Sequence, residues 1–188
     1  ATALGVYVFN SSTLEEERFI DTNTKMVTFT PDAGYIATSR PSAIDLWRTN
    51  DGKLMQSFEI PMDSVSDFTS AASLTFSSDG DLIAVGTSNN LILVWDVKSG
   101  DLLHTLEGHV NPVYAVSFSP DNTKIVSGDR TIHPNGPKEN TMKWWRVSDG
   151  SLLRSVEASS YNLAHSPDGK LLASGCGDEI CIRDANNG

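Results

Sequence analysis

Histidine, serine and aspartate are the residue types in this chain that could perform acid–base or nucleophilic chemistry. The histidines are His104, His109, His133 and His165. An activated serine would be expected in a G-x-S-x-G turn, and the sequence has none. P-loop, H-E-x-x-H and EF-hand patterns are also missing. Gly175-Cys176-Gly177 lacks the third glycine and the following helix of a dinucleotide fingerprint. The sequence therefore predicts no catalytic residue, no metal site, no cofactor and no enzyme activity.

The charge balance indicates which partners to expect. The 188 residues include 14 basic and 24 acidic ones, a formal net charge of −10. Nucleic acids and anionic membranes both require a basic protein surface, so neither is expected as a partner. No stretch approaches the roughly 20 apolar residues of a membrane span. The acidic surplus favours a protein partner with a basic patch, although it also serves solubility alone.

Two cysteines, Cys176 and Cys181, are too few for a disulfide framework. We expect both to be small core residues of two strands. A hairpin disulfide, or a metal site completed by ligands from elsewhere, is the alternative. Their number fits a reducing compartment, and we expect a cytoplasmic location.

Any site would be positioned by the strands and turns of a motif that occurs four times in the sequence. In each copy an apolar strand runs into an Asp-containing turn, followed by a second, a third and a fourth strand. The turns are Pro31-Asp32, Ser78-Asp79, Pro120-Asp121 and Pro167-Asp168, at intervals of 47, 42 and 47 residues. A fixed period in this range indicates a repeat architecture.

The third strand of each copy favours a β-propeller. Residues 91–95, for example, read Leu-Ile-Leu-Val-Trp without any polar alternation. Such a strand must be covered on both faces, whereas a two-layer sandwich covers each sheet on one face only. Four-stranded sheets arranged radially cover both. Trp144 and Trp145 are adjacent, so we expect their side chains to face two different neighbouring sheets.

The predicted class is all-β, a single propeller segment of four-stranded antiparallel blades. Its parts are a partial blade at 1–22, blades at about 24–60, 70–107 and 110–157, and an incomplete last blade at 159–188. The count of seventeen strands is a little over four blades. Open sheet edges invite pairing, so we expect further blades of a larger ring, further domains of the same polypeptide, or a homo-oligomer to cover them.

The sequence resembles the WD-repeat family of β-propellers. The resemblance rests on Gly108-His109, Val116-Ser117-Phe118-Ser119-Pro120-Asp121, Ile125-Val126-Ser127-Gly128 and Trp95-Asp96, and it extends over nearly the whole chain. It implies a structural network in which the Gly-His histidine, a second-strand Ser or Thr, an acid of the second turn and the third-strand tryptophan are linked.

Only the third copy approaches that network, with His109, Ser127 and Trp145, and with Glu139 or another loop residue as the acid. The first and second copies keep Trp47 and Trp95 but lack the Gly-His pair. The fourth copy has Arg183 in the place of the tryptophan.

The segment from Asp129 to Thr141 is the most functional-looking part of the sequence. It replaces a turn of only a few residues in the other copies, and long loops on a rigid scaffold often carry binding sites. We expect partner contacts from this loop and from the fourth-to-first strand loops on the same face. The candidates are Arg130, His133, Asn135, Lys138, Glu139, Phe68 and Asn111.

These observations favour a non-catalytic scaffold that binds a protein or peptide through the loop face. WD-repeat resemblance implies the same role. One alternative is a structural subunit that self-assembles, completing the ring or stacking with other copies. A second is a ligand-binding or enzymatic propeller, although the innermost strands repeat no histidine or carboxylate in phase.

Overall fold

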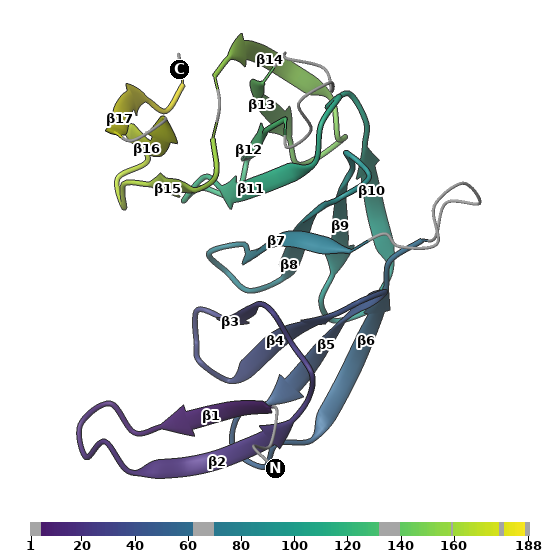
Figure 1. Ribbon diagram of the computed structural model, residues 1–188, viewed down its shortest axis with the longest axis vertical. Coiled ribbons are helices and arrows are strands. Elements are labelled where there is room, and N and C mark those ends of the chain that lie inside the picture. The colour runs from purple at the N-terminus through teal and green to yellow at the C-terminus, as the bar shows by residue number, and fades with distance from the viewer. Residues whose placement is uncertain (1–4, 62–69, 132–139, 159, 177–178, 187–188) are drawn as a thin grey trace.

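The structure is a computed structural model that describes residues 5–61, 70–131, 140–158, 160–176 and 179–186. The described residues form seventeen strands in five antiparallel sheets and no helix. The sheets stand side by side in an open arc (Figure 1). Their strand order follows the sequence, as expected for propeller blades.

The chain begins with a two-stranded ribbon, β1 (Gly5–Phe9) and β2 (Glu16–Asp21). The first blade contains β3 (Val27–Phe29), β4 (Tyr35–Arg40), β5 (Ala43–Arg48) and β6 (Leu54–Glu59). The second contains β7 (Ala71–Phe76), β8 (Leu82–Thr87), β9 (Ile92–Asp96) and β10 (Leu102–Leu106).

The third blade contains β11 (Val113–Phe118), β12 (Lys124–Asp129), β13 (Thr141–Arg146) and β14 (Leu152–Glu157). The last blade has three described strands, β15 (Leu163–His165), β16 (Leu171–Cys176) and β17 (Glu179–Asp184). The first strands β3, β7, β11 and β15 line the concave side of the arc, and successive members of this set are in contact (Figure 1).

The core lies between neighbouring blades, which confirms the reasoning from the third strands. Residues Ile92 to Trp95 of β9 are all buried, because the first blade covers one face and the third blade the other. Trp145 packs against the second blade, whereas Trp144 packs against the last blade and donates its indole N–H to the carbonyl of Ala185. The adjacent tryptophans therefore face different neighbours, as predicted.

The turn between the first and second strands has the same bonding in every blade. A hydroxyl donates to the aspartate two residues later, and it accepts the backbone N–H that opens the second strand. The hydroxyl–aspartate pairs are Thr30–Asp32, Ser77–Asp79, Ser119–Asp121 and Ser166–Asp168. The residue after the aspartate has a positive φ in each copy, which explains Gly80 and Gly169.

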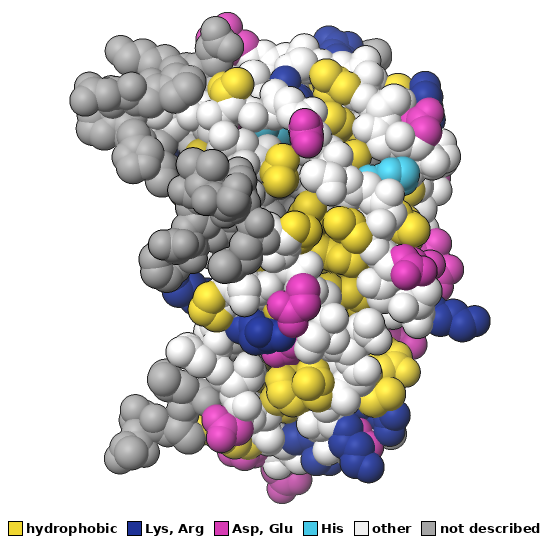
Figure 2. Space-filling model, turned by 90° about the vertical axis from the view of Figure 1, so that its right-hand side faces the viewer, with side chains coloured by type: hydrophobic (Ala, Val, Ile, Leu, Met, Phe, Trp, Pro, Cys, Tyr) yellow, Lys and Arg dark blue, Asp and Glu magenta, His cyan; other side chains and the backbone are white. Residues whose placement is uncertain are grey.

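The outermost strands expose apolar side chains at the same positions of three blades. Each of β6, β10 and β14 begins with such a pair. The pairs are Leu54-Met55, Leu102-Leu103 and Leu152-Leu153. Figure 2 views the molecule from the side on which β6 and β10 lie and shows hydrophobic side chains gathered there. The recurrence makes this surface a property of the repeat.

Candidate functional site

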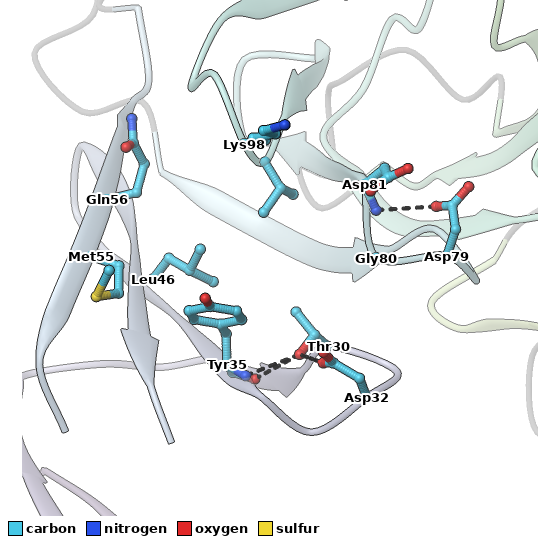
Figure 3. Close-up of a pocket in the computed structure, with 11 residues that line it drawn as sticks. Thr30, Asp32, Tyr35, Leu46, Met55, Gln56, Asp79, Gly80, Asp81 and Lys98 are labelled. Atoms are coloured by element: carbon cyan, nitrogen blue, oxygen red, sulfur yellow. Dashed lines mark hydrogen bonds between the residues drawn. The ribbon is translucent and has the colours of Figure 1, made fainter. Parts of the chain in front are cut away.

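Pockets lie in the grooves between neighbouring blades. On the side of the Asp turns, the first and second blades enclose a pocket of about 380 Å³ with Tyr35, Leu46 and Met55 on its wall. In Figure 3, Asp32 is bonded to Thr30 within its own turn, and Asp79 accepts the backbone N–H of Asp81.

The carboxylates of this pocket are already used by the fold. The hydrogen bond from the Thr30 hydroxyl holds the pKa of Asp32 below its ordinary value, and the Ser77 hydroxyl does the same for Asp79. The third and last blades form a corresponding pocket of about 410 Å³, with Asp121 in the position of Asp32. Because the pocket recurs with the repeat, it is a consequence of blade packing and we place no site there.

The third blade contains a buried chain of four polar residues. His109 Nδ1 lies 2.9 Å from Asp129 Oδ2, and His109 Nε2 lies 2.6 Å from Ser127 Oγ. The indole N–H of Trp145 donates to Ser127 Oγ at 2.8 Å. His109 Nδ1 also lies 3.1 Å from Thr141 Oγ1. With the proton on Nδ1, its N–H faces both Thr141 Oγ1 and Asp129 Oδ2, and the Ser127 hydroxyl donates to Nε2.

The acid of this network is Asp129, the last residue of β12. The sequence places Asp129 at the start of the loop and predicts Glu139 or another loop residue as the acid, so Asp129 fits the second alternative. Glu139 lies outside the described residues. Burial by itself raises the pKa of Asp129, but hydrogen bonds from His109 and from the Thr141 backbone outweigh it, so the pKa is lowered. The side chains of His109 and Asp129 have no exposed surface.

Aspartate, histidine and serine stand here in the order of a catalytic triad, but the surroundings exclude that role in this conformation. Ser127 has no exposed surface, so a substrate cannot reach its oxygen. Its oxygen also accepts the Trp145 N–H, and an attacking hydroxyl would have to give up that bond. The arrangement stabilises the blade.

The other blades keep parts of the same arrangement. The indole N–H of Trp47 donates to Thr38 Oγ1, in the position of Ser127. In the last blade Arg183 replaces the tryptophan and donates to Ser174 Oγ. The second blade has Val85 at the hydroxyl position, so Trp95 has no such acceptor there.

His165 replaces the phenylalanine that ends the first strand of the other three blades. Its ring is half-buried, and Nδ1 lies 3.0 Å from Ser117 Oγ. Burial lowers the pKa of His165, while Asp121 acts to raise it and Lys124 acts to lower it. The structure thus gives this imidazole a hydrogen-bond partner inside the fold.

The starts of the four first strands form a rim along the concave side. This rim brings together residues that lie far apart in the sequence. The first strands end in register, with Phe29, Phe76, Phe118 and His165 opposite Ile36, Ile83, Ile125 and Leu172. The residue four positions before each of these strand ends lies at the rim. In the four blades this position is occupied by Lys25, Ala72, Tyr114 and Tyr161. This alignment is the signal that could have drawn attention to the two tyrosines.

Arg130 lies directly on this rim. Its guanidinium carbon is 3.9 Å from the centre of the Tyr161 ring, a cation–π contact, and Tyr161 meets Tyr114 edge to face with ring centres 5.9 Å apart. Arg130 follows β12 and Tyr161 precedes β15, so packing of the third blade against the last one creates the cluster. Tyr161 is 42% exposed and accessible to a partner.

The remaining predicted contact residues divide into two groups. Asn111 is 3% exposed and accepts a hydrogen bond from the Thr131 hydroxyl, so its side chain supports the base of the loop instead of facing a partner. The other five lie outside the described residues. They are Phe68, His133, Asn135, Lys138 and Glu139.

The structure tests the predicted role of one of the two cysteines. The backbone of Cys176 lies in β16 and that of Cys181 in β17. Cys181 is half-buried and disulfide-bonded, so the expected core role is wrong for this residue and the alternative of a disulfide holds. The side chain of Cys176 lies outside the described part. Among the described residues, no group of three or more His, Cys, Asp and Glu side chains could hold a metal ion, and no helix could span a membrane.

These features define a repeat protein of the β-propeller class. They are the blades of in-register strands, the Asp turn in every copy and the buried Trp-Ser-His-Asp chain. A family model described as WD domain, G-beta repeat matches residues 52–96, 100–133 and 150–182, more than half of the sequence. The chain belongs to this family, whose members are generally non-catalytic scaffolds.

Similar proteins come from distant organisms. Autophagy-related protein 16 of Arabidopsis thaliana is 33% identical over 56% of this chain and 20% of its own length. WD repeat and SOCS box-containing protein 1 of Homo sapiens is 34% identical over 63% of this chain and 28% of its own length. An uncharacterized WD repeat-containing protein, sll1491, of Synechocystis sp. is 29% identical over 78% of this chain and 39% of its own length. The chain thus spans well under half the length of each of these relatives.

Proposed function

We propose that this chain is a non-catalytic interaction module that holds a protein or peptide against the loop face, at the rim of the concave side. The observation that carries the proposal is the Arg130–Tyr161–Tyr114 cluster, which is fixed by blade packing and yet partly open to solvent. Rigid aromatic and arginine side chains are the residue types that most often dominate binding energy.

The two relatives with descriptive names support a role in assemblies, since one is named for autophagy and the other for a SOCS box. His133, Asn135, Lys138, Glu139 and Phe68 remain proposed contacts on the same face, from sequence position alone. The expected basic patch on a partner, which rested on the net charge of −10, and the cytoplasmic location also remain proposals.

A photo-crosslinking comparison tests the location of the binding surface. A photoreactive phenylalanine is placed at Tyr161 on the rim, or at Lys98 on the opposite side, where the Asp turns lie. The intact chain is then irradiated in its native cell. We expect discrete covalent adducts from the Tyr161 position and few from the Lys98 position. Equal labelling at both positions, or adducts from Lys98 alone, would show that the loop face is not the binding surface.

One observation favours a second function, the structural subunit that pairs with another chain. Strand β17 is the last described strand of its sheet, and its Ile180 and Ile182 are 78% and 59% exposed. A strand with exposed apolar side chains and no described neighbour on one side is a ready acceptor for another strand. Light scattering tests this: a mass that grows with concentration and becomes monomeric on Ile182→Lys supports it, whereas a constant monomeric mass excludes it. Leu153→Lys, at an exposed position on β14, is the matched control.

A further inference from the structure

The first strands of the blades differ in charge from the chain as a whole. The four first strands, β3, β7, β11 and β15, contain no aspartate or glutamate in a protein with 24 acidic residues. The described cations near the starts of these strands include Lys25 in the first blade and Arg130 beside the last. Arg40, which lines a pocket with Lys25, is paired with Asp45 and Glu59. Lys25 and Tyr114 line one hollow of about 540 Å³ on the concave side.

Arg130 is held in place without being neutralised. Tyr161 supports one face of its guanidinium, and its backbone N–H donates to the carbonyl of Pro112 at 3.3 Å. Within the described part of the chain Arg130 forms no ion pair, whereas Arg40 and Arg146 each pair with an aspartate. A guanidinium fixed by stacking keeps its N–H donors free and loses little conformational entropy when an anion binds.

We propose that the rim binds an acidic segment of a partner protein, with a carboxylate or phosphate group on Arg130. The proposal rests on the proposed function and specifies the chemistry of its partner. Tyr114 and Tyr161 offer aromatic surface to the residues that flank the anion. Lys25, which lines the same hollow as Tyr114, adds a second positive charge. Arginine forms bidentate hydrogen bonds with both kinds of anion.

An acidic partner segment differs from the basic partner patch that the net charge of the chain suggests. Both can hold because electrostatic forces act over a short range at physiological salt. At physiological salt, charges separated by more than about 8 Å are largely screened. An anion that contacts Arg130 therefore responds mainly to that guanidinium, while the aspartates of the turns lie at the other ends of the strands. A basic patch on the same partner could still meet those turns.

A selection experiment tests the charge class directly. The intact chain is immobilised and used to select from a phage library of random 12-residue peptides. The strongest binders are then synthesised, and their affinities are measured by fluorescence anisotropy. Each is compared with versions in which Asp and Glu are changed to Asn and Gln, or in which one acidic residue is changed to phosphoserine.

We expect the selected peptides to be rich in Asp and Glu. Arg130→Gln should weaken their binding about tenfold, the value expected for loss of a charge-assisted hydrogen bond at a partly exposed site. Arg154→Gln removes the same charge from an exposed position on β14 and should leave binding unchanged. Tyr161→Leu, which keeps the charge but removes the stacking, should weaken binding about threefold. Thermal melts monitored by tryptophan fluorescence verify that each variant is folded.

The phosphoserine versions distinguish the two sources of the anion. Affinity at least tenfold above that of the acidic peptide identifies phosphate as the preferred group, and equal affinity identifies carboxylate. Selected peptides that are neutral or basic would overturn the inference, as would equal loss for Arg130→Gln and Arg154→Gln. If such peptides still lose binding on Tyr114→Ala, the loop-face function stands and only the acidic partner is wrong. Failure to select any peptide would count against both.

Discussion

The buried network of the third blade allows a quantitative prediction about Ser127. Its oxygen accepts the indole N–H of Trp145 at 2.8 Å and bonds to His109 Nε2 at 2.6 Å, and Ser127 has no exposed surface. Ser127→Ala leaves both groups without a partner in a place that water does not reach. A buried unsatisfied polar group costs about 1–3 kcal/mol. We therefore expect Ser127→Ala to lower the free energy of unfolding by about 3 kcal/mol.

The first blade offers a matched comparison. Thr38→Val removes only the hydroxyl that accepts the Trp47 N–H, and it installs the residue type that the second blade has naturally at Val85. Trp47 is partly exposed, whereas Trp145 is buried, so the N–H left without an acceptor costs less in the first blade. The expected loss is about 1 kcal/mol. Ser12→Ala, which removes an exposed hydroxyl in the turn between β1 and β2, should change the stability by less than about 0.5 kcal/mol.

Guanidinium denaturation followed by tryptophan fluorescence gives the three free energies. Hydrogen exchange of the Trp145 indole N–H, measured by NMR, reports on the same bond locally and should accelerate in Ser127→Ala alone. A loss for Ser127→Ala no larger than that for Ser12→Ala would refute the reasoning, because the network would then contribute nothing to stability. Unchanged exchange at Trp145 would show that the hydrogen bond is not the cause of any loss.

Three further predictions concern titratable groups. Hydrogen bonds, chiefly from His109, outweigh burial and lower the pKa of Asp129, so its stabilising effect is present above pH about 4 and is lost as the pH falls further. Urea titrations should show a smaller loss below pH about 4 in Asp129→Asn than in the native chain, because other aspartates with lowered pKa values contribute in both. Burial lowers the pKa of His165, so the stability of the fold should decrease as the pH drops below about 6.5. Thermal melts from about pH 5 to 8 should show this decrease in the native chain and not in His165→Phe. A parallel decrease in both proteins would contradict the assignment. Hydrogen bonds from Ser151 contribute most to lowering the pKa of Asp149 to about 2, so carboxyl NMR should record that value and a higher one in Ser151→Ala; an unshifted value in the native chain would disprove it.

The strand order and the blade class could be predicted from the sequence because they depend on local patterns. An aspartate two residues after a hydroxyl specifies a turn through bonds within five residues, as Thr30 and Asp32 show. A third strand without polar alternation, such as Ile92 to Trp95, requires cover on both faces whatever the neighbours are. The same local rule placed Trp144 and Trp145 against different blades.

The candidate site was less predictable, since its members come from different blades. Arg130 was expected as a loop contact, but its support by Tyr161 depends on how β15 packs beside β11, which no local pattern encodes. Asn111 was also expected to meet a partner, and the tertiary structure buries it instead beneath Thr131. Sequence alone determined the repeat, its turns and its two-faced strands, because these follow from bonds between near neighbours. Only the tertiary structure decided that Asp129 completes the buried network and that Arg130 stands stacked and unpaired within the described rim, because both depend on contacts between segments that folding brings together.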